Sequence, residues 1–154
     1  MRTIRQSIFE TNSSSTHAIC IAPTYNINKT EVEFGNGEFG WEVEVYRNLQ
    51  TRLDYLHEMI KYNQNYEENK QKIKDILAKH NVHCKFNDGE GYIDHCEDTN
   101  LLCNLLVNNE EILLRYLFGD TYIITGNDNS DGYDDLMQNY IDSFAEYDIF
   151  EKGN

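Results

Sequence analysis

The sequence predicts an α+β fold in which a small mixed sheet with an N-terminal hairpin packs against about four to five helices. Strand-like alternation and helix-like spacing both occur, in the order strands, helices, hairpin, helices, strand and helix. A doubly wound α/β protein would alternate them regularly. The 154 residues, 40% of them hydrophobic, are enough for one real core, so residues 1–154 are expected to form a single domain.

Strands are expected first along the chain. Residues 2–9 are rich in β-branched side chains, and residues 17–22 alternate isoleucine with small residues, which predicts two strands joined by residues 10–16. A short strand is expected at residues 31–34. In residues 41–46 apolar side chains alternate with acidic ones, which is typical of an edge strand.

Helical spacing of leucine and isoleucine predicts a helix over residues 48–62. A second helix over residues 66–79 has a thinner apolar stripe and many Lys and Glu residues, so it should be exposed on most sides. Residues 82–86 and 92–95 flank an Asp-Gly turn signal. They are therefore expected to pair as a hairpin.

The last third of the chain predicts more helices. A leucine-rich helix is expected over residues 101–106, and a further helix over residues 112–117 that ends at a glycine. Residues 121–125 predict a strand. The clearest helical stripe lies over residues 136–144, and residues 147–150 are expected to form a last strand or turn.

The acidic charge is confined to one half of the chain. The formal net charge is -14, yet residues 1–85 hold 11 basic and 11 acidic residues, whereas residues 86–154 hold 2 basic and 16 acidic ones. Such a half repels phosphate, which argues against direct binding of DNA or RNA. It would be steered towards a protein with a basic surface. The alternative is that the acidity serves solubility alone.

No apolar run approaches the length of a membrane helix, and the N-terminus lacks the apolar region of a secretory signal. A cytoplasmic protein is therefore expected. Its four cysteines are then most simply reduced thiols. The sequence indicates no cofactor.

Six small polar residues, 11–16, lie between the first two expected strands and precede His17. Such side chains stabilise tight exposed turns by bonding their own backbone. Turned outwards, they can instead gather around a phosphate, and a serine near a histidine can act as a nucleophile. An alternative hypothesis is thus a hydrolase or transferase for a phosphate-bearing or nucleotide ligand, with these candidate catalytic residues: Ser13, Ser14, Ser15, His17, Asp94 and His95.

Four segments of the sequence are similar to segments of known proteins. They are FETNSSSTH at residues 9–17, GEFGW at 37–41, GYIDH at 91–95 and FGDTYIITGNDN at 118–129. The chain resembles, through these landmarks, small bacteriophage and bacterial proteins without a settled activity. The resemblance transfers no catalytic residues. It implies a role in countering host defence, by analogy with small acidic anti-CRISPR proteins.

Two His-Cys dipeptides, at residues 83–84 and 95–96, suggest zinc, which favours these ligands. However, neighbours in a strand point to opposite faces, so one dipeptide does not easily supply two ligands. Ordinary hairpin residues are the simpler interpretation.

Residues 127–138 partly match a calcium loop, with Asn127, Asn129 and Asp131 at the first, third and fifth positions. The first position is normally Asp, and the last, normally Glu, is Gln138. Both changes remove charge that calcium needs, so no metal is expected.

The glycine-rich residues 35–41 do not have the spacing or context of a nucleotide-binding loop. A turn that places Phe39 and Trp41 on the core is the simpler interpretation.

The leading hypothesis is a non-enzymatic protein that binds and inhibits or modulates a host protein, such as a CRISPR effector with a basic, nucleic-acid-binding surface. Acidic residues would supply the complementary charge, and tyrosines would anchor the contact. The candidate partner-binding residues are Asp128, Asp131, Tyr133, Asp134, Asp135, Tyr140, Asp142 and Glu146.

Overall fold

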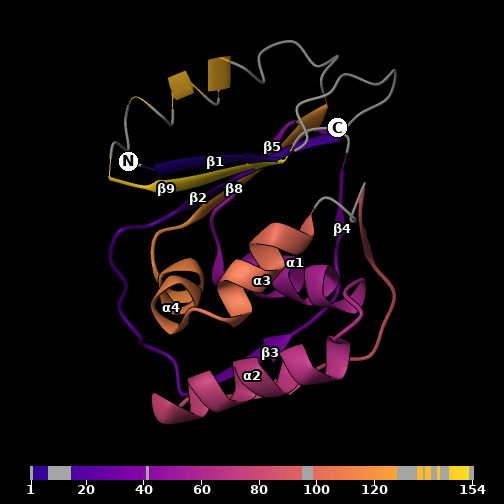
Figure 1. The fold of residues 1–154 in the computed structure, drawn as a ribbon, viewed down its shortest axis with the longest axis vertical. Helices are drawn as coiled ribbons and strands as arrows, with labels where there is room; N and C mark the ends of the chain where they lie inside the picture. Colours follow the sequence, from indigo (N-terminus) through magenta and orange to yellow (C-terminus); the bar gives the residue numbers. More distant parts are fainter. Residues whose placement is uncertain are drawn as a thin grey trace.

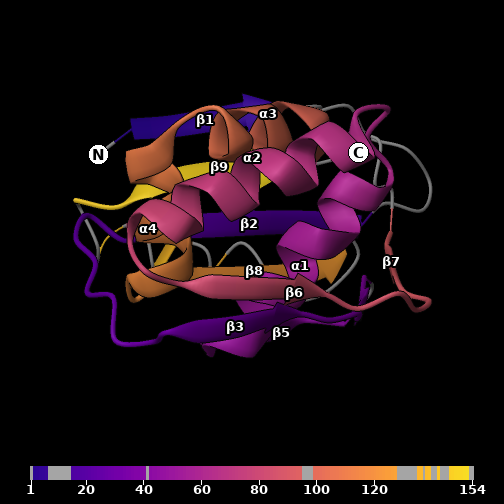
Figure 2. The ribbon, with the colours of Figure 1, turned by 90° about the horizontal axis from the view of Figure 1, so that it is seen from below.

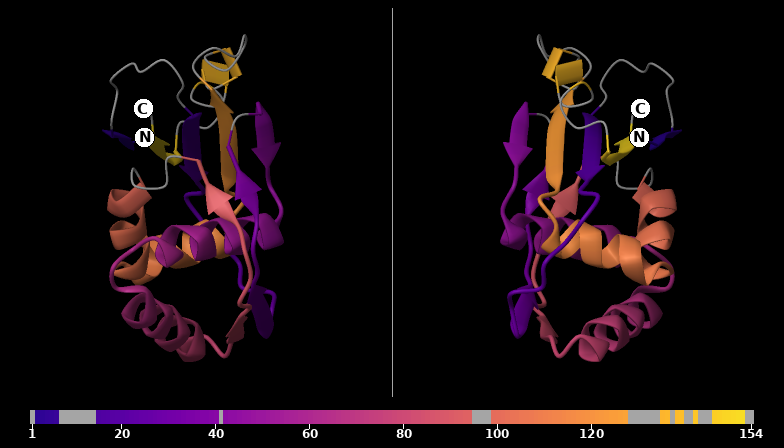
Figure 3. Two further views of the ribbon diagram at one scale, coloured as in Figure 1. Left: turned by 90° about the vertical axis from the view of Figure 1, so that its right-hand side faces the viewer. Right: turned by 90° about the vertical axis from the view of Figure 1, so that its left-hand side faces the viewer.

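The protein is an α+β structure built on a five-stranded mixed sheet (Figure 1). The computed structural model describes residues 2–6, 15–40, 42–94, 99–127, 135–136, 138–139, 142 and 146–152. The strand order is β1-β9-β2-β8-β5. Its strands are β1 (Arg2–Gln6), β2 (Ser15–Ile21), β5 (Glu44–Tyr46), β8 (Tyr122–Asn127) and β9 (Asp148–Lys152). The strands β1 and β5 form opposite edges of the sheet (Figure 3).

The expected N-terminal hairpin is wrong, because β9 lies between β1 and β2. The strand β1 runs parallel to β9, and β2 runs antiparallel to it, with Ile19 opposite Phe150. Ile149 and Phe150 are both buried. The strand β9 thus buries Ile149 and Phe150 at an interior position of the sheet, whereas β1 occupies an edge.

The described part of the chain contains four helices, the lower number of the four to five expected. They are α1 (Leu49–Lys61), α2 (Tyr66–Lys79), α3 (Asn100–Val107) and α4 (Glu110–Phe118). Asparagine caps two of them: the side chain of Asn48 accepts from the Thr51 amide at 2.7 Å, and that of Asn109 accepts from the Ile112 amide at 3.1 Å. These caps satisfy backbone donors that a helix leaves unpaired at its start.

The main core lies between the helices and one face of the sheet (Figure 1). Ile19 and Ile21 of β2 point to this face, which α1, α3 and α4 cover. Ala18 and Cys20 point to the opposite face and form a second, smaller cluster. The alternation follows from the two-residue period of a strand. As expected, α2 is largely exposed and buries only Asn69, Ile73 and Leu77.

The expected hairpin of residues 82–95 is also wrong. The strand β6 (His83–Phe86) pairs with β3 (Glu31–Phe34), and β7 (Tyr92–Ile93) pairs with β4 (Glu38–Phe39), both in parallel. Figure 2 shows β3 and β6 side by side. Residues 31–39 and 83–93 thus run alongside each other, joined through α1 and α2. The Asp-Gly signal marks a loop instead of a tight hairpin turn, because β6 and β7 pair with other strands and not with each other.

Candidate functional site

One face of α1 holds the glycine-rich loop 35–37 in place. The Gly35 amide donates to Asp54 Oδ1 at 3.0 Å, and His57 Nδ1 donates to the Gly35 carbonyl oxygen at 2.6 Å. The Gly37 amide donates to Glu58 Oε1 at 3.2 Å. The three side chains lie at i, i+3 and i+4, so they share one helix face. The helix thereby fixes the start of β4, which follows the loop.

Glycine at position 91 lets β7 approach this face closely. A β-carbon there would lie 2.3 Å from Glu58 Oε1 and 2.4 Å from the Gly37 carbonyl oxygen, so no larger residue fits without a shift. The Tyr92 amide donates to that same carbonyl at 2.9 Å. A buried carboxylate and a missing side chain therefore set β7 against β4.

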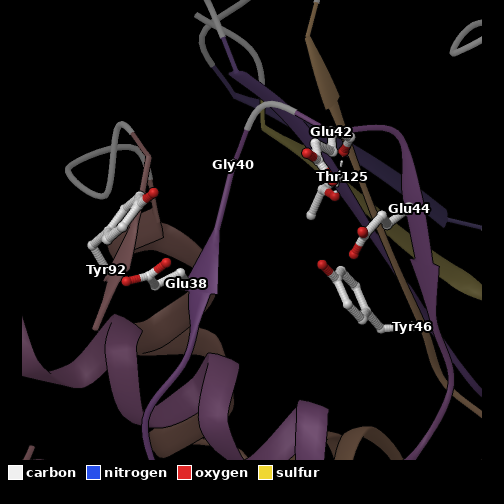
Figure 4. Close-up of a pocket in the computed structure, with 7 residues that line it drawn as sticks. All are labelled: Glu38, Gly40, Glu42, Glu44, Tyr46, Tyr92 and Thr125. Carbon is white, nitrogen blue, oxygen red and sulfur yellow. Dashed lines mark hydrogen bonds between the residues drawn. The ribbon is translucent and has the colours of Figure 1, made fainter. Parts of the chain in front are cut away.

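A pocket of about 360 Å³ lies between β4 and β5 (Figure 4). Its lining comes from four strands and the segment that joins β4 to β5. The lining residues are Glu38, Gly40, Glu42, Glu44, Tyr46, Tyr92 and Thr125. The Tyr46 hydroxyl and the Glu44 carboxylate both point into the opening in Figure 4.

The pocket is acidic and partly aromatic. Three of its seven lining residues are glutamates and none is basic. Burial first, and then the neighbouring Glu44 carboxylate, raises the pKa of the Tyr46 hydroxyl above its ordinary value. Tyr46 therefore remains a neutral hydrogen-bonding group at physiological pH. The site offers negative charge beside an uncharged phenol, which suits a cation or a hydrogen-bond donor.

A second pocket, of about 500 Å³, adjoins the first and shares Glu38 and Tyr92 with it. These two residues face each other in the register of β4 and β7. The second pocket contains one basic residue, Lys61, whose ammonium already donates to Glu58 Oε1 at 2.9 Å, to the Gly89 carbonyl at 3.2 Å and to Asn36. The ammonium of Lys61 therefore already has three hydrogen-bond acceptors within the protein. The two adjoining pockets are together called the acidic groove below.

Two of the predicted catalytic residues lie near the acidic groove. His17 is fully buried in β2, where it faces Thr125, a residue that lines the first pocket. The Asp94 amide donates to the Phe39 carbonyl at 2.8 Å, and the Asp94 side chain lies against Gly40. Of the remaining candidates, Ser15 has a described backbone opposite Asn127, while Ser13, Ser14 and His95 lie outside the described residues.

All four landmark segments contribute residues in or beside the acidic groove. GEFGW supplies Glu38 and Gly40, GYIDH supplies Gly91 and Tyr92, and FGDTYIITGNDN supplies Thr125. The fourth, FETNSSSTH, ends at His17, the cross-strand neighbour of Thr125. Strand pairing brings together segments that lie far apart in the sequence.

None of the three predicted partner-binding residues that the structure describes lines either pocket. Leu136 packs against the cluster on the face of the sheet opposite the helices. Asp135, Asp142 and Glu146 are exposed, and Asp142 accepts a hydrogen bond from Gln138 Nε2 at 2.8 Å. The other five lie outside the described residues: Asp128, Asp131, Tyr133, Asp134 and Tyr140.

The described residues do not form either of the metal sites considered from the sequence. His83 is exposed and Cys84 is buried, as expected for neighbours in a strand, while residues 95–96 lie outside the described part of the chain. Asn129 and Asp131 of the partial calcium loop lie outside it as well, and Asn127 is described only as the end of β8. Among the residues that the structure does describe, no group of three or more potential ligands is placed to hold a metal. In the same residues, no helix is long and apolar enough to cross a membrane.

Sequence reasoning missed the glutamates of the acidic groove. The signal was present in the alternating segment 41–46, which puts Glu42 and Glu44 on a common side of an extended chain. Nothing local indicated that Glu38 and Tyr92 would line the same opening. Comparison of the chain with protein families, with curated proteins and with solved structures finds no significant match.

Proposed function

We propose that the protein is a non-catalytic binding module that docks a protein partner through a basic segment, with a nucleic-acid-binding host defence protein as the target class. The observation that carries the proposal is the acidic first pocket, whose lining residues include three glutamates and no basic residue. The net charge of -14 supports it, because a long-range negative field speeds encounter with a basic surface. The resemblance to phage proteins suggests that the partner belongs to the host.

A lysine or arginine side chain fits the chemistry of the pocket. The glutamates supply attraction, the Tyr46 and Tyr92 rings can cover the aliphatic part of a long basic side chain, and the neutral Tyr46 hydroxyl adds a hydrogen-bonding group. Lys61 does not compete for these carboxylates, because Glu58 and Asn36 already hold it. An acidic ligand such as a phosphate would meet repulsion instead.

The proposal is tested with a short fluorescent peptide of alternating lysine and serine, titrated by anisotropy at low salt. The variant E38Q/E42Q/E44Q removes three charges from the first pocket. It should weaken binding by about tenfold, since each exposed ion pair contributes roughly half a kcal/mol. Raising the salt from about 50 to about 300 mM should weaken binding to the unmodified protein more than binding to the variant.

A charge-matched control is provided by D135N/D142N/E146Q, which removes three exposed charges from residues that line neither pocket. It should change the affinity by no more than about twofold. Equal loss in both triple variants would show that only net charge matters, and loss confined to the control would move the site to residues 135–146. Either result would overturn the pocket as the docking site.

A further inference from the structure

The strand β4 has one paired edge and one unpaired edge among the described residues. The carbonyls of Gly37 and Phe39 accept from the amides of Tyr92 and Asp94 of the β7 segment, at 2.9 and 2.8 Å. Backbone groups of successive strand residues point to opposite edges. Glu38 and Gly40 therefore direct their amide and carbonyl groups away from β7.

The unpaired edge faces the first pocket. Glu38 and Gly40 are both lining residues, and in Figure 4 the pocket separates β4 from β5 on the side away from β7. The described residues contain no strand paired to this edge, since β4 and β7 form a two-stranded sheet. An open strand edge is a template for another extended chain.

We infer that the partner segment binds as an added strand: a basic, extended peptide pairs its backbone with Glu38 and Gly40 and directs a lysine or arginine at Glu42 and Glu44. The inference rests on the proposed function and specifies its docking mode. Charge complementarity selects this occupant, because the same opening offers backbone pairing on one wall and carboxylates on the other. A helix would present no backbone donors or acceptors to this edge.

The contacts that hold β4 in place indicate that its open edge is preorganised for binding. Glu58, buried beneath the loop, accepts from the Gly37 amide at 3.2 Å, and β7 fixes the other side of β4. The open edge is short, because only Glu38 and Gly40 direct backbone groups away from β7. Backbone pairing therefore mainly sets the register of the bound peptide against β4. The glutamates add specificity for positive charge.

Backbone N-methylation separates this inference from the proposed function. Two versions of the lysine–serine peptide carry N-methyl groups on all lysines or on all serines, which leaves every side chain unchanged. Only alternate residues of an added strand donate to β4. One version should therefore bind about fivefold to tenfold more weakly than the parent, and the other should bind within about twofold of it.

The outcomes are distinct. If both versions match the parent, or both weaken equally, strand addition is wrong while binding of a basic segment to the acidic groove stands. If the parent peptide itself fails to bind, the proposed function and this inference fall together.

As an independent readout, amide hydrogen exchange followed by NMR should slow at Glu38 and Gly40 on peptide binding. Unchanged exchange at both amides would contradict the pairing.

Discussion

Nδ1 of His17 lies 2.8 Å from the hydroxyl oxygen of Tyr55. This hydrogen bond joins the central strand β2 to the middle of α1. Both residues are fully buried, and their ring centroids lie 5.8 Å apart. Tyr55 also packs edge-on against Phe39 of β4, at 4.9 Å. A single phenol thus connects the five-stranded sheet to the strand that forms one wall of the acidic groove.

The variant Y55F should lower the free energy of unfolding by about 1–3 kcal/mol, because it leaves a buried imidazole nitrogen without this bond. Urea denaturation measures the change. The control is Y25F, which removes a hydroxyl from a ring that is 40% exposed and should have almost no effect. Equal stabilities for Y55F and the unmodified protein would show that the bond contributes nothing.

A second prediction concerns Lys61 and the fully buried carboxylate of Glu58, which lie 2.9 Å apart. The variant K61M removes the ammonium and leaves the buried carboxylate without its partner, which should cost about 3 kcal/mol of stability. In the exposed pair of Lys72 and Glu68 on α2, at 3.1 Å, the matched variant K72M should cost less than about 1 kcal/mol. A similar cost for both variants would contradict a special role for the buried pair.

The stability should depend on pH through His57. Burial, followed by the nearby charge of Lys61, lowers the pKa of this imidazole below its ordinary value of 6.5, while its bond to the Gly35 carbonyl opposes the shift. The unfolded chain therefore binds the proton more readily than the folded protein. The neutral ring adds stability above pH 6.5, and this contribution is lost as the pH falls towards the lowered pKa.

This dependence can be measured by urea unfolding at about pH 7.5 and about pH 5.5. Asparagine at position 57 retains an N–H donor for Gly35 but does not titrate. The loss of stability between the two pH values should be smaller in H57N than in the unmodified protein. An identical loss in both proteins would assign the dependence to other groups.

The described cysteines should be unreactive while the protein is folded. Burial raises the pKa of Cys20 to about 12 and that of Cys103 to about 11, and it also raises the pKa of Cys84. A thiol that stays protonated is a poor nucleophile. In the variant C96S, iodoacetamide at about pH 8 should label none of the three until denaturant is added, as read by mass spectrometry. Rapid labelling of native Cys20 would contradict its burial.

The helices could be predicted from local pattern. The expected ranges 48–62 and 66–79 agree closely with α1 and α2, because the 3.6-residue period of leucine and isoleucine lies within one continuous segment. Asn48 and Asn109 act as local capping signals in the same way. The strands expected at residues 31–34 and 121–125 also followed from their own composition, and they correspond to β3 and to β8 at Tyr122–Asn127.

The candidate site could not be predicted in the same way. Its glutamates are visible in the sequence, but Glu38, Tyr92 and Thr125 form one pocket only because β4 pairs with β7 and β5 pairs with β8. Those pairings join residues that lie more than 50 positions apart in the sequence. The turn signal at residues 87–89 favoured a hairpin, but β6 and β7 pair with β3 and β4 and not with each other.

The sequence by itself determined the α+β class, the approximate positions of the four described helices and the total negative charge, because each depends on composition or on neighbours within a few turns of chain. Only the tertiary structure decided which strands pair, that β9 separates β1 from β2, and where the carboxylates gather. The physical reason is that backbone hydrogen bonds between strands are chemically alike for every partner. Burial of Phe150 and the close approach at Gly91 select among them, and both are properties of the folded chain.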